Sequence, residues 1–130
     1  MKKGPVLILG AHSDIGKSIT HKFASKGHDI QLAARRSYEL ETFSEQIKSN
    51  YSVTVKKYEF DILFTDKHLQ FINDLDKLPE ILICCVGLMA DQKNSEKNKS
   101  TRIDVIRSNF EGPLNIISEF ANYFEERGSG

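Results

Sequence analysis

Short apolar runs alternate with helical apolar stripes along this chain of 130 residues. Four β-prone runs predict strands, and each is followed by a segment in which apolar residues recur every three or four positions, as on one face of a helix. The uniformly apolar first and fourth runs are typical of strands covered on both faces. The predicted strands are Val6–Leu9, Asp29–Ala34, Ser52–Phe60 and Ile81–Val86.

Three predicted helices are bounded by residues that start or stop a helix. Gly27 can end the first helix, and Ser37 can cap the second, which closes near Asn50. Thr65 or Asp66 can cap the third, and Pro79 ends it. Their apolar stripes are Ile15, Ile19 and Phe23; Leu40, Phe43 and Ile47; and Leu69, Ile72 and Leu75.

The last part of the chain predicts a loop and then a long helix. The segment Asp91–Thr101 is polar and is expected to be a surface loop. A helix is expected from Arg102 to about Arg127, and Gly112-Pro113 should bend it or interrupt one turn. Its stripe is Ile103, Ile106, Phe110, Leu114, Ile117, Phe120 and Phe124.

The predicted order is therefore β-α-β-α-β-α-β-α, with connections too long for hairpins. Such alternation implies a parallel sheet with helices on both faces. Neither a repeat nor a low-complexity linker divides the sequence. We expect one α/β domain over residues 1–130.

Composition narrows the class of protein. Charged residues make up 28% of the chain and sum to a net charge of zero, so no bulk field favours nucleic acid or a membrane surface as a partner. No apolar run approaches the roughly 18 residues of a membrane span. The adjacent Cys84 and Cys85 would point to opposite faces of a strand, without a His cluster nearby, so we expect reduced thiols, no metal site and a cytoplasmic protein.

The stretch 10-GAHSDIGKS-18 follows the first predicted strand and suggests a nucleotide site. A P-loop of a nucleotide triphosphatase needs four residues between its first Gly and Gly-Lys-Ser, but five separate Gly10 from Gly16. A dinucleotide site needs a strand, a tight turn and a helix whose N-terminus faces the pyrophosphate. A plain turn without any ligand is the third alternative.

The turn resembles that of the short-chain dehydrogenases/reductases, which runs Gly, three residues, Gly, any residue, Gly. Gly10 and Gly16 match the first and last glycines, and Asp14 replaces the middle one. The resemblance covers essentially all 130 residues. It implies a Rossmann-like, doubly wound sheet of about four strands that forms the first, cofactor-binding half of a larger domain.

The resemblance also assigns the cofactor. In the family an acid after the second strand binds the ribose of NAD, but here Ala34 stands there and Arg35 and Arg36 follow. Because a guanidinium suits a phosphate, NADP is expected over NAD. Asp61 corresponds to the residue that contacts adenine. The expected cofactor-binding residues are Gly10, His12, Ser13, Asp14, Ile15, Gly16, Arg35, Arg36, Asp61, Ile62, Val86 and Gly87.

Of the catalytic set that the resemblance implies, the chain contains only Asn109, the helical Asn that holds a water for proton relay. Cys84-Cys85-Val86-Gly87 replaces the family's Asn-Asn-Ala-Gly, and no Tyr is followed by Lys four residues later. We therefore expect part of an oxidoreductase that acts on a carbonyl or secondary alcohol, inactive alone. The alternative is a non-catalytic NADP(H)-binding or assembly module. A homo-oligomer is expected, formed through the apolar strand Ile81–Val86 or the last helix.

Overall fold

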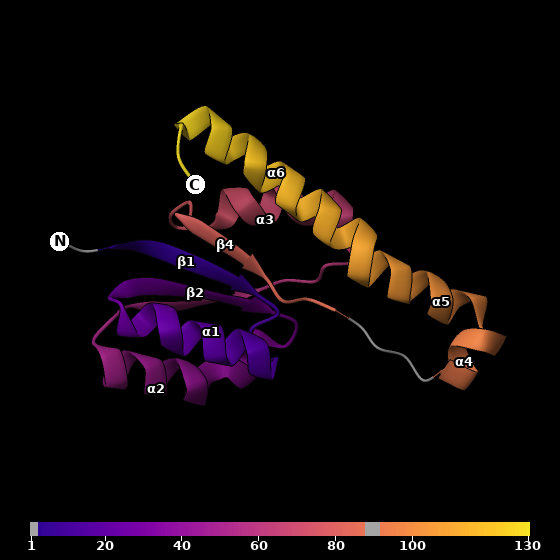
Figure 1. Ribbon diagram of the computed structural model, residues 1–130, viewed down its shortest axis with the longest axis horizontal. Coiled ribbons are helices and arrows are strands. Elements are labelled where there is room, and N and C mark those ends of the chain that lie inside the picture. The colour runs from indigo at the N-terminus through magenta and orange to yellow at the C-terminus, as the bar shows by residue number, and fades with distance from the viewer. Residues whose placement is uncertain (1–2, 88–91) are drawn as a thin grey trace.

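The computed structural model describes residues 3–87 and 92–130, which form one parallel sheet flanked by helices (Figure 1). The sheet order is β3-β2-β1-β4, and every pairing is parallel. The predicted Rossmann-like α/β architecture is therefore confirmed, although the third and fourth strands are shorter than predicted. The strands are β1 (Lys3–Leu9), β2 (His28–Ala34), β3 (Val55–Glu59) and β4 (Ile81–Cys84).

Helices cover both faces of the sheet because β1 is apolar on both of its sides. Val6 and Ile8 pack into one cluster with helices α1 (Asp14–Ser25) and α2 (Glu41–Tyr51). Leu7 and Leu9 belong to the other cluster, beneath α3 (His68–Asp74) and α6 (Gly112–Arg127). Figure 1 shows α1 and α2 below the sheet and α3 and α6 above it. These four residues of β1 are fully buried.

Helix α1 contacts the sheet through small residues rather than through the whole predicted stripe. Ile15 is 68% exposed, so its predicted place in the core is wrong. The buried residues of α1 are Gly16, Thr20 and Ala24, and the Thr20 hydroxyl donates to the Gly16 carbonyl at 2.8 Å. The small side chains let the helix backbone approach the sheet closely, and Ile15 lies outside this buried face.

The predicted caps of the second and third helices are wrong. A 3-10 turn (Ser37–Leu40) precedes α2, and the Ser37 side chain caps nothing there. Another 3-10 turn (Thr65–Lys67) precedes α3 and likewise has no side-chain cap. In both places the extra turn contains the predicted cap residues, because the tighter turn satisfies backbone groups that a cap would otherwise satisfy.

The predicted polar loop is wrong over its described residues. Helices α4 (Gln92–Lys97) and α5 (Lys99–Ile106) lie there, while Asp91 is outside the described residues. The Asn98 side chain accepts a hydrogen bond from the Thr101 backbone and caps α5. The Arg102 guanidinium donates to two carbonyls of α4. The polar composition of this segment therefore did not reveal its two short helices.

The predicted long helix is interrupted, as expected, but one turn earlier than the proline pair. A π-turn (Arg107–Glu111) joins α5 to α6, and Pro113 lies in the first turn of α6. Only part of the predicted stripe is buried: Phe120 packs in the core, whereas five members are exposed. We call these five the outer stripe: Ile103, Ile106, Phe110, Leu114 and Ile117. Among the described residues, no helix has the length and apolar character to span a membrane.

Candidate cofactor-binding site

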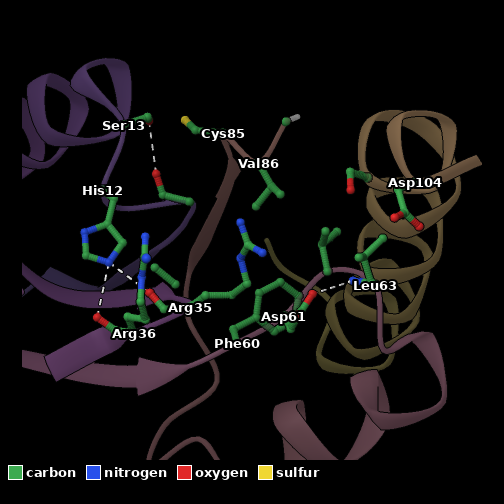
Figure 2. A pocket seen from close by; sticks show the side chains of 15 residues that line it. His12, Ser13, Arg35, Arg36, Phe60, Asp61, Leu63, Cys85, Val86 and Asp104 are labelled. Atoms are coloured by element: carbon green, nitrogen blue, oxygen red, sulfur yellow. Dashed lines mark hydrogen bonds between the residues drawn. The ribbon is translucent and has the colours of Figure 1, made fainter. Parts of the chain in front are cut away.

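A cavity of about 320 Å³ opens where the carboxyl ends of the parallel strands meet. Figure 2 shows His12 and Ser13 on one side of the cavity and Asp104 on the other. Nine of the twelve residues predicted to bind the cofactor line it; Asp14, Ile15 and Gly16 do not. The lining residues are Gly10, His12, Ser13, Ala34, Arg35, Arg36, Phe60, Asp61, Ile62, Leu63, Cys85, Val86, Gly87, Asp104 and Ser108.

The turn between β1 and α1 depends on its two glycines. Gly10 has a positive φ of 82°, and a Cβ on it would lie 2.8 Å from the Cys85 carbonyl group. A Cβ on Gly16 would lie 2.8 Å from the Gly10 carbonyl oxygen. The Ser13 hydroxyl donates to that oxygen and accepts from the Gly16 backbone, each at 3.0 Å. The start of α1 is thereby held close to the cavity.

Lys17, the residue that would reach the terminal phosphates in a P-loop, points elsewhere. Its ammonium lies 5.4 Å from the centre of the Phe43 ring and does not line the cavity. The turn therefore lacks the cation that a triphosphate site needs.

His12 has a structural contact that the sequence did not reveal. Its Nε2 lies 2.9 Å from the Arg35 carbonyl oxygen and 3.3 Å from that of Arg36. Because a carbonyl only accepts hydrogen bonds, Nε2 carries the proton and donates it. His12 thus fastens the turn after β1 to the segment after β2.

The segment after β2 brings two guanidinium groups to the cavity. Ala34 is buried, and the side chains of Arg35 and Arg36 line the cavity wall. Arg36 adopts a left-handed backbone with φ of 50°, and its Nε lies 3.7 Å from the carboxylate of Glu39. This wall of the cavity therefore carries two guanidinium groups.

The residues Asp61–Leu63 form a second wall. The Asp61 carboxylate accepts from the Leu63 backbone at 2.9 Å, which fixes its orientation. The Arg107 guanidinium donates to the Leu63 carbonyl at 3.0 Å. A Cβ on Gly112 would lie 2.7 Å from the Ile62 carbonyl oxygen, so only glycine lets α6 approach this closely.

A buried histidine supports the same loop. His68 is 1% exposed, and its Nε2 donates to the Ile62 carbonyl oxygen at 3.1 Å. Its Nδ1 accepts from the Asn115 amide at 2.7 Å. Burial lowers the pKa of His68 below its usual value. The neutral ring therefore joins the loop to α6 through one donor and one acceptor.

A third wall contains residues that were not predicted from the sequence. Asp104 and the buried Ser108 line the cavity from the helix opposite the turn. They are four residues apart and thus lie on one helix face, which is the signal that could have identified them. Asn109 does not line the cavity, but its Oδ1 would lie 3.3 Å from a Cβ on Gly87.

The two adjacent cysteines contribute shape rather than reactivity. Cys84 and Cys85 are unbridged and half-buried, and burial raises the pKa of each thiol. Neutral thiols are poor nucleophiles and poor metal ligands. Across residues 3–87 and 92–130, no group of His, Cys, Asp or Glu could hold a metal ion.

Sheet topology, the glycine turn and the cationic wall together define the class of a Rossmann-like nucleotide-binding domain. Residues 5–130 match the sequence model of the short chain dehydrogenases. The chain belongs to the short-chain dehydrogenase/reductase family, which confirms the resemblance drawn from its motifs.

Known proteins agree with this assignment. The chain is 29% identical over 125 residues to the probable 2,4-dienoyl-CoA reductase 3 of Caenorhabditis elegans, covering 90% of this chain and 40% of that protein. It superimposes with a TM-score of 0.82 on a short-chain dehydrogenase from Sphingobium yanoikuyae in complex with NADPH, at 22% identity. It also superimposes with a TM-score of 0.86 on a 3-oxoacyl-[acyl-carrier protein] reductase from Brucella melitensis with bound NAD, at 18% identity.

These structural matches cover 98% and 99% of this chain but only 51% of each of the matched chains. The chain thus spans about half the length of the proteins it resembles. The fold likeness extends through the whole of the described structure.

Proposed function

We propose that this chain is the NADP(H)-binding part of an oxidoreductase that acts on a carbonyl or a secondary alcohol. The observation that carries the proposal is the cationic wall formed by Arg35 and Arg36 beside the glycine turn, with Ala34 where an acid would favour NAD. Two guanidinium groups can bind a 2′-phosphate bidentately. NADPH in one structural neighbour supports a nicotinamide cofactor, and NAD in another leaves the choice between the two to experiment.

The residues present fit such a cofactor. Gly10 packs against the Cys85 backbone with no room for a Cβ, so the turn stays tight beside the start of α1, where a pyrophosphate would bind. The fixed Asp61 carboxylate can accept from an adenine amino group. Bound NADP(H) would supply or take up the hydride. Asn109, beside Gly87, would hold a water for proton transfer.

We expect the chain alone to bind NADPH and to turn nothing over, because no Tyr in the sequence is followed by Lys four residues later. The other candidate, a non-catalytic NADP(H)-binding or assembly module, predicts the same binding. Fusing the chain to a family partner segment that carries Tyr-x-x-x-Lys would distinguish the two. Carbonyl reduction by the fusion supports the oxidoreductase, whereas tight binding without reduction supports the module.

The test of cofactor choice is a titration with NADPH, NADH and Mg-ATP. The Arg35→Ala/Arg36→Ala variant should weaken NADPH binding at least about tenfold and change NADH binding less than about twofold, as loss of a phosphate contact predicts. The control Lys22→Ala/Lys26→Ala removes the same charge from exposed positions near the end of α1. Preference for NADH would reject the roles of Arg35 and Arg36, and preference for Mg-ATP would reject the dinucleotide site.

We further propose self-association through the outer stripe. Three residues of this stripe follow one another at a spacing of four: Ile106, Phe110 and Leu114. Their side chains are 61%, 67% and 55% exposed, so together they form a continuous apolar face. Phe110→Glu should shift the chain toward monomer in sedimentation velocity at concentrations well above micromolar. The control Glu126→Gln changes an exposed residue of α6, outside the outer stripe. A monodisperse wild-type monomer under these conditions would contradict the proposal.

A further inference from the structure

Glu59, the last residue of β3, makes an unusual contact beside the cationic wall. Its Oε1 accepts from the Arg36 backbone N–H at 2.7 Å, and its Oε2 accepts from that of Ser37 at 2.9 Å. The left-handed backbone of Arg36 turns these two consecutive amides toward one point. Consecutive amides arranged in this way form a nest, which binds anions.

The anion held in this nest belongs to the protein itself. Hydrogen bonding from the Ser37 backbone lowers the pKa of Glu59, so the side chain is a carboxylate at neutral pH. Arg35 and Arg36 line the main cavity, and both also line a second cavity of about 410 Å³ that Glu59 borders. The anion-binding nest beside the two arginines is therefore already occupied by the negative charge of Glu59.

The charges around the nest are mixed. Arg36 also pairs with Glu39 at 3.7 Å, and His12 is close enough to favour the charged form of Glu59. Lys67 borders the second cavity. An incoming anion would meet two carboxylates as well as the guanidinium groups.

We propose that Glu59 competes with the 2′-phosphate of NADP(H) and thereby sets the preference between NADPH and NADH. The inference rests on the proposed function, because it assumes that a nicotinamide dinucleotide binds here. A doubly charged phosphate cannot share two N–H donors with a carboxylate, so Glu59 must move away or be neutralised when the phosphate binds. A free ribose hydroxyl does not repel the carboxylate and can donate to it. Glu59 therefore opposes the selectivity that Arg35 and Arg36 confer.

The experiment compares Glu59→Gln with wild type by fluorescence titration of NADPH and NADH at fixed ionic strength. Gln preserves the length and one acceptor oxygen but removes the charge. NADPH affinity should rise about tenfold, and NADH affinity should change less than about twofold, because only the phosphate competes for the amides. The control Glu45→Gln makes the same change in net charge at an exposed residue paired with Lys48 at 3.0 Å. It should leave both affinities unchanged.

Glu59→Asp provides a second variant, because it retains the charge in a shorter side chain. Its gain in NADPH affinity should be clearly smaller than that of Gln; an equal gain would reject competition between charges. Amide NMR gives a readout independent of affinity. In wild type the Arg36 and Ser37 amides should shift on adding NADPH and remain nearly unchanged with NADH.

The two proposals fail differently. If wild type binds both cofactors and Glu59→Gln keeps the same affinity ratio, the role of Glu59 is rejected while the proposed function stands. If neither cofactor binds wild type or Glu59→Gln, the proposed function is rejected and the role of Glu59 with it.

Discussion

Two loops border the cavity, and they are held in place by different means. The turn at residues 10–16 is held within itself by Ser13, which bonds to Gly10 and Gly16. Its other partners lie at the neighbouring end of β2, where the Ala33 and Arg35 carbonyl oxygens accept from the Gly10 backbone and from His12. The loop at residues 61–63 is fixed by residues far along the chain. Arg107, 44 positions after Leu63, donates to it, and His68 connects it to Asn115.

One side of the site is thus held by elements near in the sequence, and the other side is held by elements far along the chain. The turn takes its shape once α1 and β2 are in place, and it needs neither the π-turn nor α6. The Asp61–Leu63 loop takes its shape only when the π-turn and α6 dock against it. We therefore expect disturbances of α6 to reach Asp61–Leu63 and to leave the turn unchanged.

The largest expected effect is that of Gly112→Ala. The new Cβ would meet the Ile62 carbonyl oxygen at 2.7 Å and the Arg107 carbonyl oxygen at 3.0 Å, so backbone must move. We expect a loss of about 2 kcal/mol in the free energy of unfolding, within the range for overpacked sites. Urea denaturation measures this loss.

The matched control for Gly112→Ala is Ser118→Ala, at an exposed position of α6, which should change stability by less than about 0.5 kcal/mol. Hydrogen exchange gives the spatial test. The Leu63 and Phe64 amides should exchange faster in Gly112→Ala, while those of Ser13 and Gly16 keep the wild-type rate. Equally faster amide exchange in both loops would contradict the conclusion that α6 supports only the Asp61–Leu63 loop.

A smaller effect is expected from His68→Gln and depends on pH. The pKa of His68 is lowered in the folded protein, so the unfolded chain takes up a proton first as pH falls below about 6.5. Wild type should therefore lose stability as pH decreases from about 6.5 toward the folded pKa, and lose none through His68 at higher pH. Gln can donate to Ile62 and accept from Asn115 without titrating.

The measurement for His68→Gln is the free energy of unfolding at pH 7.5 and at pH 5.5. The variant should lose less stability between the two values than wild type loses. A pH dependence equal to that of wild type would show that His68 does not titrate on unfolding, and would contradict its role as a buried neutral connector.

The same contrast explains what the sequence could predict. Apolar runs such as Val6–Leu9 and Ile81–Cys84 predict strands, and alternation with helices implies a parallel sheet. The run at Val6–Leu9 is fully buried, whereas β4 lies at the sheet edge and is only half-buried. The sheet then brings the carboxyl ends of all strands together, which is why Gly10, Arg35, Asp61 and Gly87 meet in one cavity. The local sequence pattern and the sheet topology were sufficient to predict that these residues lie together.

Residues that depend on distant partners were not predictable. The backbone amides of Arg36 and Ser37 bond to Glu59, 23 and 22 positions away, a contact that no local rule predicts. The Ser37 cap that local rules favoured is absent, because a 3-10 turn begins there instead. Gly16 packs closely against Gly10 on the inner side of α1 while Ile15 is exposed, an arrangement that apolar spacing alone does not predict. The polar residues 92–101 were predicted to be a loop, but they form α4 and α5. Asn98 caps the start of α5, and Arg102 donates to a carbonyl group of α4.

The π-turn at residues 107–111 has a consequence for how this gene can change. A π-turn amounts to one extra residue in an α-helix, so a single-codon deletion within it would restore a regular helix instead of breaking it. Because the widened turn takes up its extra residue locally, α5 and α6 would keep nearly the same orientation relative to each other after the deletion. The change would be confined to residues 107–111, where Arg107 donates to Leu63 and Ser108 lines the cavity. A lineage that lost one codon here could retain its fold and still alter one wall of its site.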